Sequence, residues 1–153
     1  MPLPVAVTIR VATLADVDAL SDLLSVLFGQ EHEFRPDVPA QRRGLTRIIA
    51  SPDTGLVLLA AADERVLAMV NLLFTVSTAL GERVALLEDM VVAPGVRGTG
   101  LGSRLLGEAL VAARGAGCKR ITLLTDHDNH DAQRFYAKHG FARSSMVPMR
   151  ILL

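Results

Sequence analysis

Residues 87–102 read LEDMVVAPGVRGTGLG, and the order of their apolar residues and glycines is the most informative pattern in the sequence. A hydrophobic strand pattern ends at Pro94-Gly95, glycines then alternate at positions 98, 100 and 102, and an amphipathic helix pattern follows. Glycine lets the main chain approach an anion without a Cβ in the way, and a helix N-terminus adds unpaired N–H donors. The loop therefore suits a pyrophosphate, with Arg97 as an added cation, although a tight strand-to-helix turn with a solvated arginine would look the same.

Two other phosphate-binding loops are excluded by spacing. A dinucleotide fingerprint needs Gly-x-Gly-x-x-Gly in a first strand-helix unit, whereas this loop reads Gly-x-Gly-x-Gly late in the chain. An ATPase-type loop ends in Gly-Lys-Ser or Gly-Lys-Thr, whereas Gly102 is followed by Ser103-Arg104. The ligand class must come from other parts of the sequence.

The composition bounds the class of protein. The chain has 153 residues, is 50% hydrophobic and has a formal net charge of zero, so we expect one domain over residues 1–153 and neither a nucleic-acid nor a membrane partner. Cys118 is the single cysteine, which excludes an intrachain disulfide framework and fits a cytoplasmic location. Residues 1–11 are a poor signal peptide, because they lack a basic start and contain Pro2 and Pro4.

The first half of the chain predicts a strand, two helices and a hairpin. Val5 to Val11 alternate as a strand does, and Thr13 to Asp16 form a capping box for a helix that ends near Gly29. A loop is expected over residues 30–39 and a helix over 40–50. Strands over 56–61 and 66–76, separated by a polar turn at 63–65, read as a hairpin.

The second half predicts a strand over 84–92, then the glycine loop and its helix, which Gly115 and Gly117 end. A short strand over 121–124 follows. The polar run 126–129 caps a last helix that continues through His139, and residues 141–153 read as a closing strand.

A second motif lies in that last helix. Residues 129–141 read NHDAQRFYAKHGF, which matches the pattern Asn-x-x-Ala-x-x-Phe-Tyr-x-x-x-Gly-Phe. Together with the Arg97 loop, in this order along the chain, it resembles the GNAT superfamily of N-acetyltransferases. The resemblance is specific from Val84 to Phe141, and the order of elements upstream is compatible with it.

The resemblance implies a mixed α/β fold: a mostly antiparallel central sheet of about six to seven strands, splayed in the middle and flanked by about four helices. It implies acetyl-CoA as co-substrate, with the pantetheine arm between the strands that hold Met90 and Ile121. The main chain of Met90, Val91 and Val92 would bind the arm. The pyrophosphate would lie on residues 97–103, namely Arg97, Gly98, Thr99, Gly100, Leu101, Gly102 and Ser103. Homodimerisation is a family expectation.

Acetyl transfer to an amine needs a neutral amine and a proton for the departing thiolate. Alkylammonium groups are protonated at neutral pH, so a carboxylate is a sensible base, and Glu88 and Asp89 are the candidates. Adjacent strand residues point to opposite faces, so one of the two should face the acceptor. We favour Glu88, because diamine acetyltransferases carry a similar Glu-Asp pair in which the glutamate is implicated; a surface ion pair is the structural alternative.

Tyr136 is the only tyrosine, and the resemblance places its phenol near the thioester sulfur, where it could protonate the thiolate. The alternative is a packed aromatic with a hydrogen-bonded hydroxyl. Asn129 could contact the pantetheine or cap the last helix, and the sequence does not choose between these roles.

Three other features of the sequence are weaker indications of a functional site. The Asp and His residues at 126–131 are explained by helix capping and by the helix dipole, so we expect no metal. Cys118 reads as a structural thiol rather than a nucleophile. Residues 31–34, Glu-His-Glu-Phe, sit where the family often builds its acceptor pocket, yet a solvated loop would have the same composition.

Three functions compete. The leading one is transfer of an acetyl group from acetyl-CoA to a primary amine on a small molecule, with Glu88 as base and Tyr136 as acid. A protein N-terminus or lysine could instead be the acceptor, and the donor chain could be longer than acetyl. A module that binds acyl-CoA without turnover would be expected to lack Glu88 and Tyr136, and both are present.

Overall fold

The computed structural model describes residues 6–31 and 34–153, so Val5, His32 and Glu33 lie outside the described residues. The elements follow one another as β1 (Thr8–Val11), η1 (Leu14–Asp16), α1 (Val17–Phe28), α2 (Val38–Ala50), β2 (Gly55–Ala62), β3 (Arg65–Ser77), β4 (Glu82–Val92), η2 (Pro94–Val96), α3 (Leu101–Gly115), β5 (Ile121–Leu123) and α4 (His130–Lys138). The two η elements are single turns of 3₁₀-helix.

The described strands form one sheet in the order β1-β2-β3-β4-β5. The first four are antiparallel neighbours, as expected for consecutive strands joined by short turns, and β5 is parallel to β4. The β2–β3 turn contains Asp63 and Glu64, both with positive φ, which matches the twist of a tight hairpin. The predicted hairpin and the mixed, mostly antiparallel sheet are confirmed.

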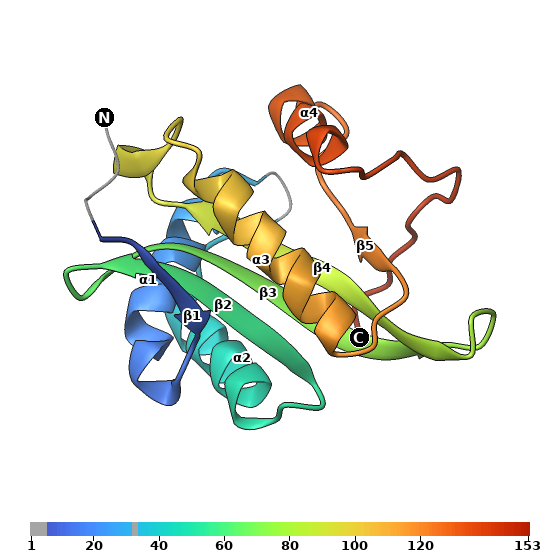
Figure 1. Ribbon diagram of the computed structural model, residues 1–153, viewed down its shortest axis with the longest axis horizontal. Helices are drawn as coiled ribbons and strands as arrows, with labels where there is room; N and C mark the ends of the chain where they lie inside the picture. The colour runs from blue at the N-terminus through green and yellow to red at the C-terminus, as the bar shows by residue number, and fades with distance from the viewer. Residues whose placement is uncertain (1–5, 32–33) are drawn as a thin grey trace.

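Helices cover both faces of this sheet (Figure 1). Alternate residues of β2 show why: Leu58 and Ala60 pack with Leu105 and Leu106 of α3, whereas Leu59 on the opposite face packs with α1 and α2. Each helix buries one apolar stripe against one face of the sheet, which gives two hydrophobic cores separated by the strands.

The β3–β4 ladder contains a register shift, and the extra residue lies in β4. Asn71 of β3 pairs with Asp89 and Leu72 pairs with Leu87, so Glu88 is an extra residue in a β-bulge. A bulge places two residues of one strand opposite one residue of its partner and bends the strand. Glu88 therefore does not follow the alternation that the sequence pattern assumes.

The helices begin and end close to the predicted caps, except that α2 begins two residues earlier than predicted. Asp16 accepts a hydrogen bond from the Thr13 N–H at 2.7 Å, as the capping box requires. The second helix begins at Val38 rather than Ala40, because Asp37 caps it by accepting the Ala40 N–H at 3.0 Å and proline is tolerated in a first turn. The predicted loop over residues 30–39 is therefore shorter.

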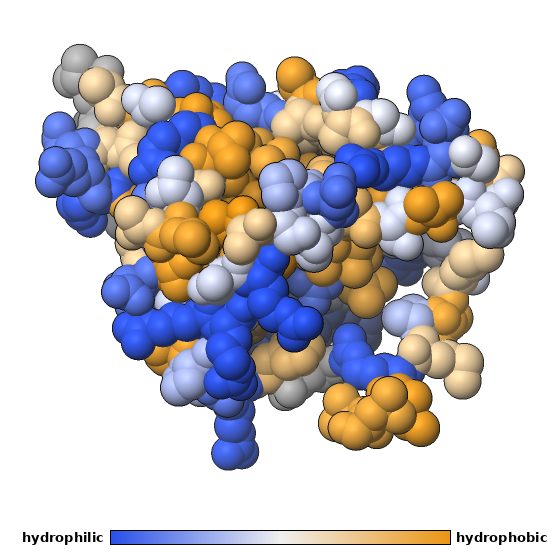
Figure 2. Space-filling model, turned by 90° about the horizontal axis from the view of Figure 1, so that it is seen from below, coloured by the Kyte–Doolittle hydropathy of each residue, from blue (hydrophilic) through white to orange (hydrophobic). Residues whose placement is uncertain are grey.

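The predicted closing strand at 141–153 is wrong, and so is the count of six to seven strands. Described residues contain five strands, and 142–153 form no ladder with β5, whose residues pair with β4. Most large apolar side chains of this segment are exposed: Met146, Val147, Met149, Ile151, Leu152 and Leu153. Figure 2 shows hydrophobic residues reaching the surface among long charged side chains.

In the part of the chain described, no helix combines the length and the hydropathy needed to cross a bilayer.

Candidate acyl-transfer site

The sheet opens where β5 leaves β4. The β4–β5 ladder joins Ala85–Leu87 to Ile121–Leu123 and stops there, while β4 continues to Val92. The splayed sheet is thus present, but Ile121 lies in the paired part, so the segment across the gap from Met90 is Leu124–Asp126. The main chain of β4 beyond Leu87 presents an edge without a partner strand among the described residues.

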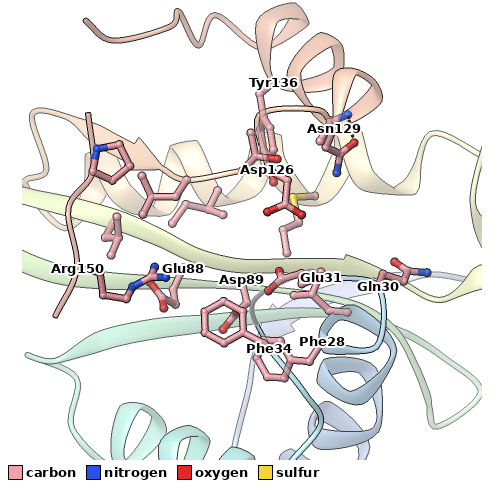
Figure 3. Close-up of a pocket in the computed structure, with 18 residues that line it drawn as sticks. Phe28, Gln30, Glu31, Phe34, Glu88, Asp89, Asp126, Asn129, Tyr136 and Arg150 are labelled. Carbon is pink, nitrogen blue, oxygen red and sulfur yellow. Dashed lines mark hydrogen bonds between the residues drawn. The ribbon is translucent and has the colours of Figure 1, made fainter. Parts of the chain in front are cut away.

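A cavity of about 550 Å³ occupies this opening. Its wall combines α1, the loop that follows it, the middle of β4, the end of β5, α4 and the C-terminal segment; the residues labelled in Figure 3 are Phe28, Gln30, Glu31, Phe34, Glu88, Asp89, Asp126, Asn129, Tyr136 and Arg150. Glu88 and Asp89 lie between the two phenylalanines on one side and Tyr136 on the other (Figure 3).

Both adjacent carboxylates of β4 line the cavity, contrary to the expectation that only one of the two could face it. The bulge at Glu88 is the reason, since it interrupts the alternation of faces. Asp89 is bonded to buried Asn71, which donates to Oδ2 at 2.9 Å and accepts the Asp89 N–H at 2.7 Å. Burial raises the pKa of Asp89 to about 6; the Asn71 hydrogen bond opposes this rise and the charge of Glu88 adds to it.

Tyr136 enters the same cavity from α4. Its ring meets Phe135 and Phe141 edge to face, at centroid distances of 5.2 and 5.6 Å. Burial, with a contribution from the negative charge of Asp89, raises the pKa of Tyr136 to about 12, so the phenol stays protonated at neutral pH. Asn129 caps α4 by accepting the Ala132 N–H at 3.1 Å and also lines the cavity, so both of its alternative roles remain open.

The glycine loop has the backbone that its sequence predicts. Gly98 and Gly100 have φ values of 75° and 85°, a region that favours glycine, and no atom lies within 4 Å of a Cβ built at either position. The Arg97 Nε donates to the Val92 carbonyl at 3.0 Å, and the Thr99 hydroxyl donates to the Val96 carbonyl at 2.6 Å. The first bond ties the loop to the end of β4, and the second ties it to η2.

The loop leads directly into the N-terminus of α3. Leu101, Gly102 and Ser103 form the first turn, where N–H groups have no acceptor within the helix. Leu101 is fully buried and anchors this turn in the core. The Ser103 hydroxyl lies 3.1 Å from the His139 Nε2, which joins the end of α4 to the start of α3. The first turn of α3 thus offers main-chain N–H groups beside the two positive-φ glycines, an arrangement suited to an anion.

The other residues considered in the sequence analysis lie in the cavity wall or in the two hydrophobic cores. Met90 lines the cavity, Val92 packs on the α3 side, and Val91 is buried on the face that packs against α1 and α2. Cys118 is buried in the α3 core, where burial raises the pKa of its thiol. Over residues 6–31 and 34–153, no group of three or more His, Cys, Asp or Glu side chains could hold a metal ion.

A sequence model of the acetyltransferase (GNAT) family matches residues 18–141, which is most of the chain. The chain belongs to this family.

Similar proteins agree with this assignment. The aminoalkylphosphonate N-acetyltransferase of Salmonella typhimurium is 29% identical over 89% of this chain and 85% of its own length. The uncharacterized N-acetyltransferase YhfO of Bacillus subtilis is 29% identical over 87% of this chain and 88% of its own. A crystal structure of a probable acetyltransferase superposes with a TM-score of 0.79 and 25% identity, covering 95% of this chain and 97% of the other.

Several residues in or beside this cavity were not predicted from the sequence. Asn71 could have been noticed as the one amide in the apolar run of β3, because a buried polar side chain needs a partner. Phe28 and Arg150 have no such signal, since they come from a helix end and from a segment predicted as a strand. Arg150 lies 5.7 Å from the centroid of the Phe34 ring, so the C-terminal segment forms part of the cavity wall.

Proposed function

We propose that this protein transfers the acetyl group of acetyl-CoA directly to a primary amine of a small molecule. The observation that carries the proposal is a single cavity, lined by Glu88, Asp89 and Tyr136, at the open edge of β4. A proton acceptor and a proton donor thus face one space, and the anion-binding loop begins a few residues further along the same strand.

The chain has the features needed to hold coenzyme A. The open edge at Met90–Val92 offers main-chain groups to the amides of the pantetheine arm, much as a neighbouring strand would. The positive-φ glycines and the first turn of α3 support a pyrophosphate on residues 97–103, where a Cβ at Gly98 or Gly100 would occupy open space beside the anion. Acetyl-CoA supplies the acetyl group activated as a thioester.

Asp89, Glu88 and Tyr136 each have a separate role in the reaction. Asp89, ionised above about pH 6, attracts the ammonium form of the acceptor, and Glu88 accepts a proton from it, directly or through water. The neutral nitrogen attacks the thioester carbonyl, a C–N bond forms and the C–S bond breaks, and the nitrogen releases its second proton to give the amide. Tyr136 donates its proton to the departing thiolate and is reprotonated, through water, by the proton that the nitrogen released. The proton first taken by Glu88 passes to solvent, so each transfer releases one proton in total.

A small-molecule acceptor is supported by two observations. The cavity of about 550 Å³ is bounded by the loop after α1 and by the C-terminal segment. The relative from Salmonella typhimurium is named for the acetylation of aminoalkylphosphonates, which are small amines.

Release of free thiol from acetyl-CoA, measured against a panel of amines, amino acids and peptides, tests this function. Tyr136→Phe should lower acceptor-dependent release about 10- to 100-fold, because it removes the acid and keeps the ring contacts. Coenzyme A affinity should stay unchanged. Phe141→Leu is the matched control: it removes a ring contact and keeps the phenol, so it should lower the melting temperature more than the turnover. Absence of coenzyme A binding, or of thiol release with every amine, would overturn the proposal. Release that Tyr136→Phe leaves intact would overturn the role of Tyr136 as the acid.

A further inference from the structure

A second cavity of about 360 Å³ lies behind the two carboxylates, between α1, α2 and the strands β3 and β4. It shares Phe28, Phe34, Glu88 and Asp89 with the first cavity, so the two spaces meet at the carboxylates. The rings of Phe28 and Phe34, with centroids 5.8 Å apart, stand at the junction.

The wall of the second cavity is mainly apolar. Besides the two phenylalanines, its apolar lining consists of Leu24, Ala40, Leu45, Ile48 and Leu73. Leu24 and Leu45 are buried core residues, so this part of the wall is fixed by the packing of α1 against α2.

Most polar side chains of this wall already form hydrogen bonds with other groups of the protein. Gln41 donates to the Ser21 carbonyl at 3.0 Å and accepts the Asp37 N–H at 2.8 Å. Asp37 caps α2 at Ala40, and Asn71 holds Asp89. Arg35 is exposed, on the loop before α2. The cavity therefore offers a ligand apolar contact rather than new hydrogen bonds.

We infer that the acceptor is a primary amine carried on an apolar body, an alkyl or aryl-alkyl amine, whose apolar part occupies this second cavity while its nitrogen lies at Glu88 and Asp89. This inference rests on the proposed function. The volume fits, because a cavity of about 150 Å³ is enough for a benzene ring, so about 360 Å³ holds a ring with a short alkyl linker. The carboxylates select the ammonium group, and the apolar wall selects what it is attached to.

Gly44 gives direct access to this cavity. It lines the space from α2, and no atom lies within 4 Å of a Cβ built on it. The Cβ of a leucine there would meet no atom, and leucine favours a helix more than glycine does, so the variant should fold and add an apolar side chain to the lining of the cavity. Gly107 of α3 also has no atom within 4 Å of its Cβ and lines neither cavity, so Gly107→Leu is a matched control.

The experiment measures kcat/KM for linear alkylamines from ethylamine to hexylamine, with phenethylamine, putrescine and aminoethylphosphonate alongside. Wild type and Gly107→Leu should gain about fourfold per added methylene until the cavity is filled. Gly44→Leu should lose this gain. A flat series, a preference for putrescine or aminoethylphosphonate, or a Gly44→Leu variant that keeps the chain-length dependence would overturn the inference.

Binding without turnover separates this inference from the proposed function. Calorimetric titration of hexylamine into the protein saturated with coenzyme A should show binding that Gly44→Leu weakens at least tenfold and Gly107→Leu does not. Hexylamine binding of this kind with no thiol release from any amine would retain the cavity assignment and overturn the transferase. Thiol release from polar amines with no hexylamine binding would retain the transferase and overturn the apolar acceptor.

Discussion

The bulge at Glu88 and the glycine loop that starts at Arg97 lie on the same strand and its continuation, yet they support the site in different ways. At the loop, the groups that we propose to bind the pyrophosphate are main-chain N–H donors, and the side chains of Arg97 and Thr99 are bonded back to β4 and to Val96. At the bulge, side chains face the cavity and a buried amide on the neighbouring strand holds one of them. Substitutions should therefore act through side-chain chemistry at the bulge and through backbone conformation at the loop.

The largest effect should come from Glu88→Gln, which removes the charge and keeps the shape. Loss of the base should lower kcat/KM for amines about 100-fold, while the coenzyme A dissociation constant, measured by calorimetry, stays within twofold. Glu82→Gln is the matched control, because Glu82 is exposed at the start of β4 and lines neither cavity. Equal kcat/KM values for the two variants would remove Glu88 from the mechanism.

An intermediate effect is expected at the loop. In Gly100→Ala the new Cβ meets no neighbouring atom, but the φ of 85° is unfavourable for an L-residue by about 1–2 kcal/mol. Coenzyme A affinity should therefore fall about 5- to 30-fold as the loop leaves this conformation. Gly95→Ala, also in open space and without a positive φ, should bind coenzyme A as wild type does. The same calorimetric titration checks both, and identical affinities would contradict the role assigned to the backbone.

The same contrast explains what the sequence could predict. The loop was predictable because its requirements are local: glycines at alternate positions, a strand before and a helix after, all within residues 87–115. The bulge was not, because it depends on how β4 pairs with β3, and pairing with Asn71 joins residues 18 positions apart. Alternation alone placed Glu88 and Asp89 on opposite faces, although both line the cavity.

The strand predicted over residues 141–153 was wrong for a related reason. Its apolar residues match a strand pattern, but a strand exists only where a partner offers a hydrogen-bonding edge, and that cannot be read from residues 141–153 alone. The contribution of Arg150 to the cavity wall was hidden for the same reason. Element types with local signals, such as the hairpin turn and the helix caps, were predicted correctly.

The smallest effect, and the sharpest test of the bulge, is a shift in pH dependence. Asp89 must be ionised to attract the acceptor, so log kcat/KM should fall below about pH 6 in the wild type. The Asn71 amide stabilises the ionised form of Asp89. Asn71→Leu removes it, so the pKa of Asp89 should rise and the acid limb should move to higher pH by about half to one unit.

Two further variants separate this electrostatic effect from a loss of stability. Ser77→Ala removes another buried hydrogen-bonding side chain of β3, whose Oγ accepts the Leu80 N–H at 3.1 Å, and should lower the melting temperature without moving the acid limb. Glu88→Gln removes a charge that raises the pKa of Asp89, so its residual activity should show the limb displaced to lower pH. If the acid limb moves to higher pH in Asn71→Leu and to lower pH in Glu88→Gln, the limb belongs to Asp89. The first variant removes a group that lowers the pKa of Asp89, and the second removes a group that raises it. Superimposable profiles in all three variants would instead mean that the Asn71–Asp89 bonds only hold the two strands together.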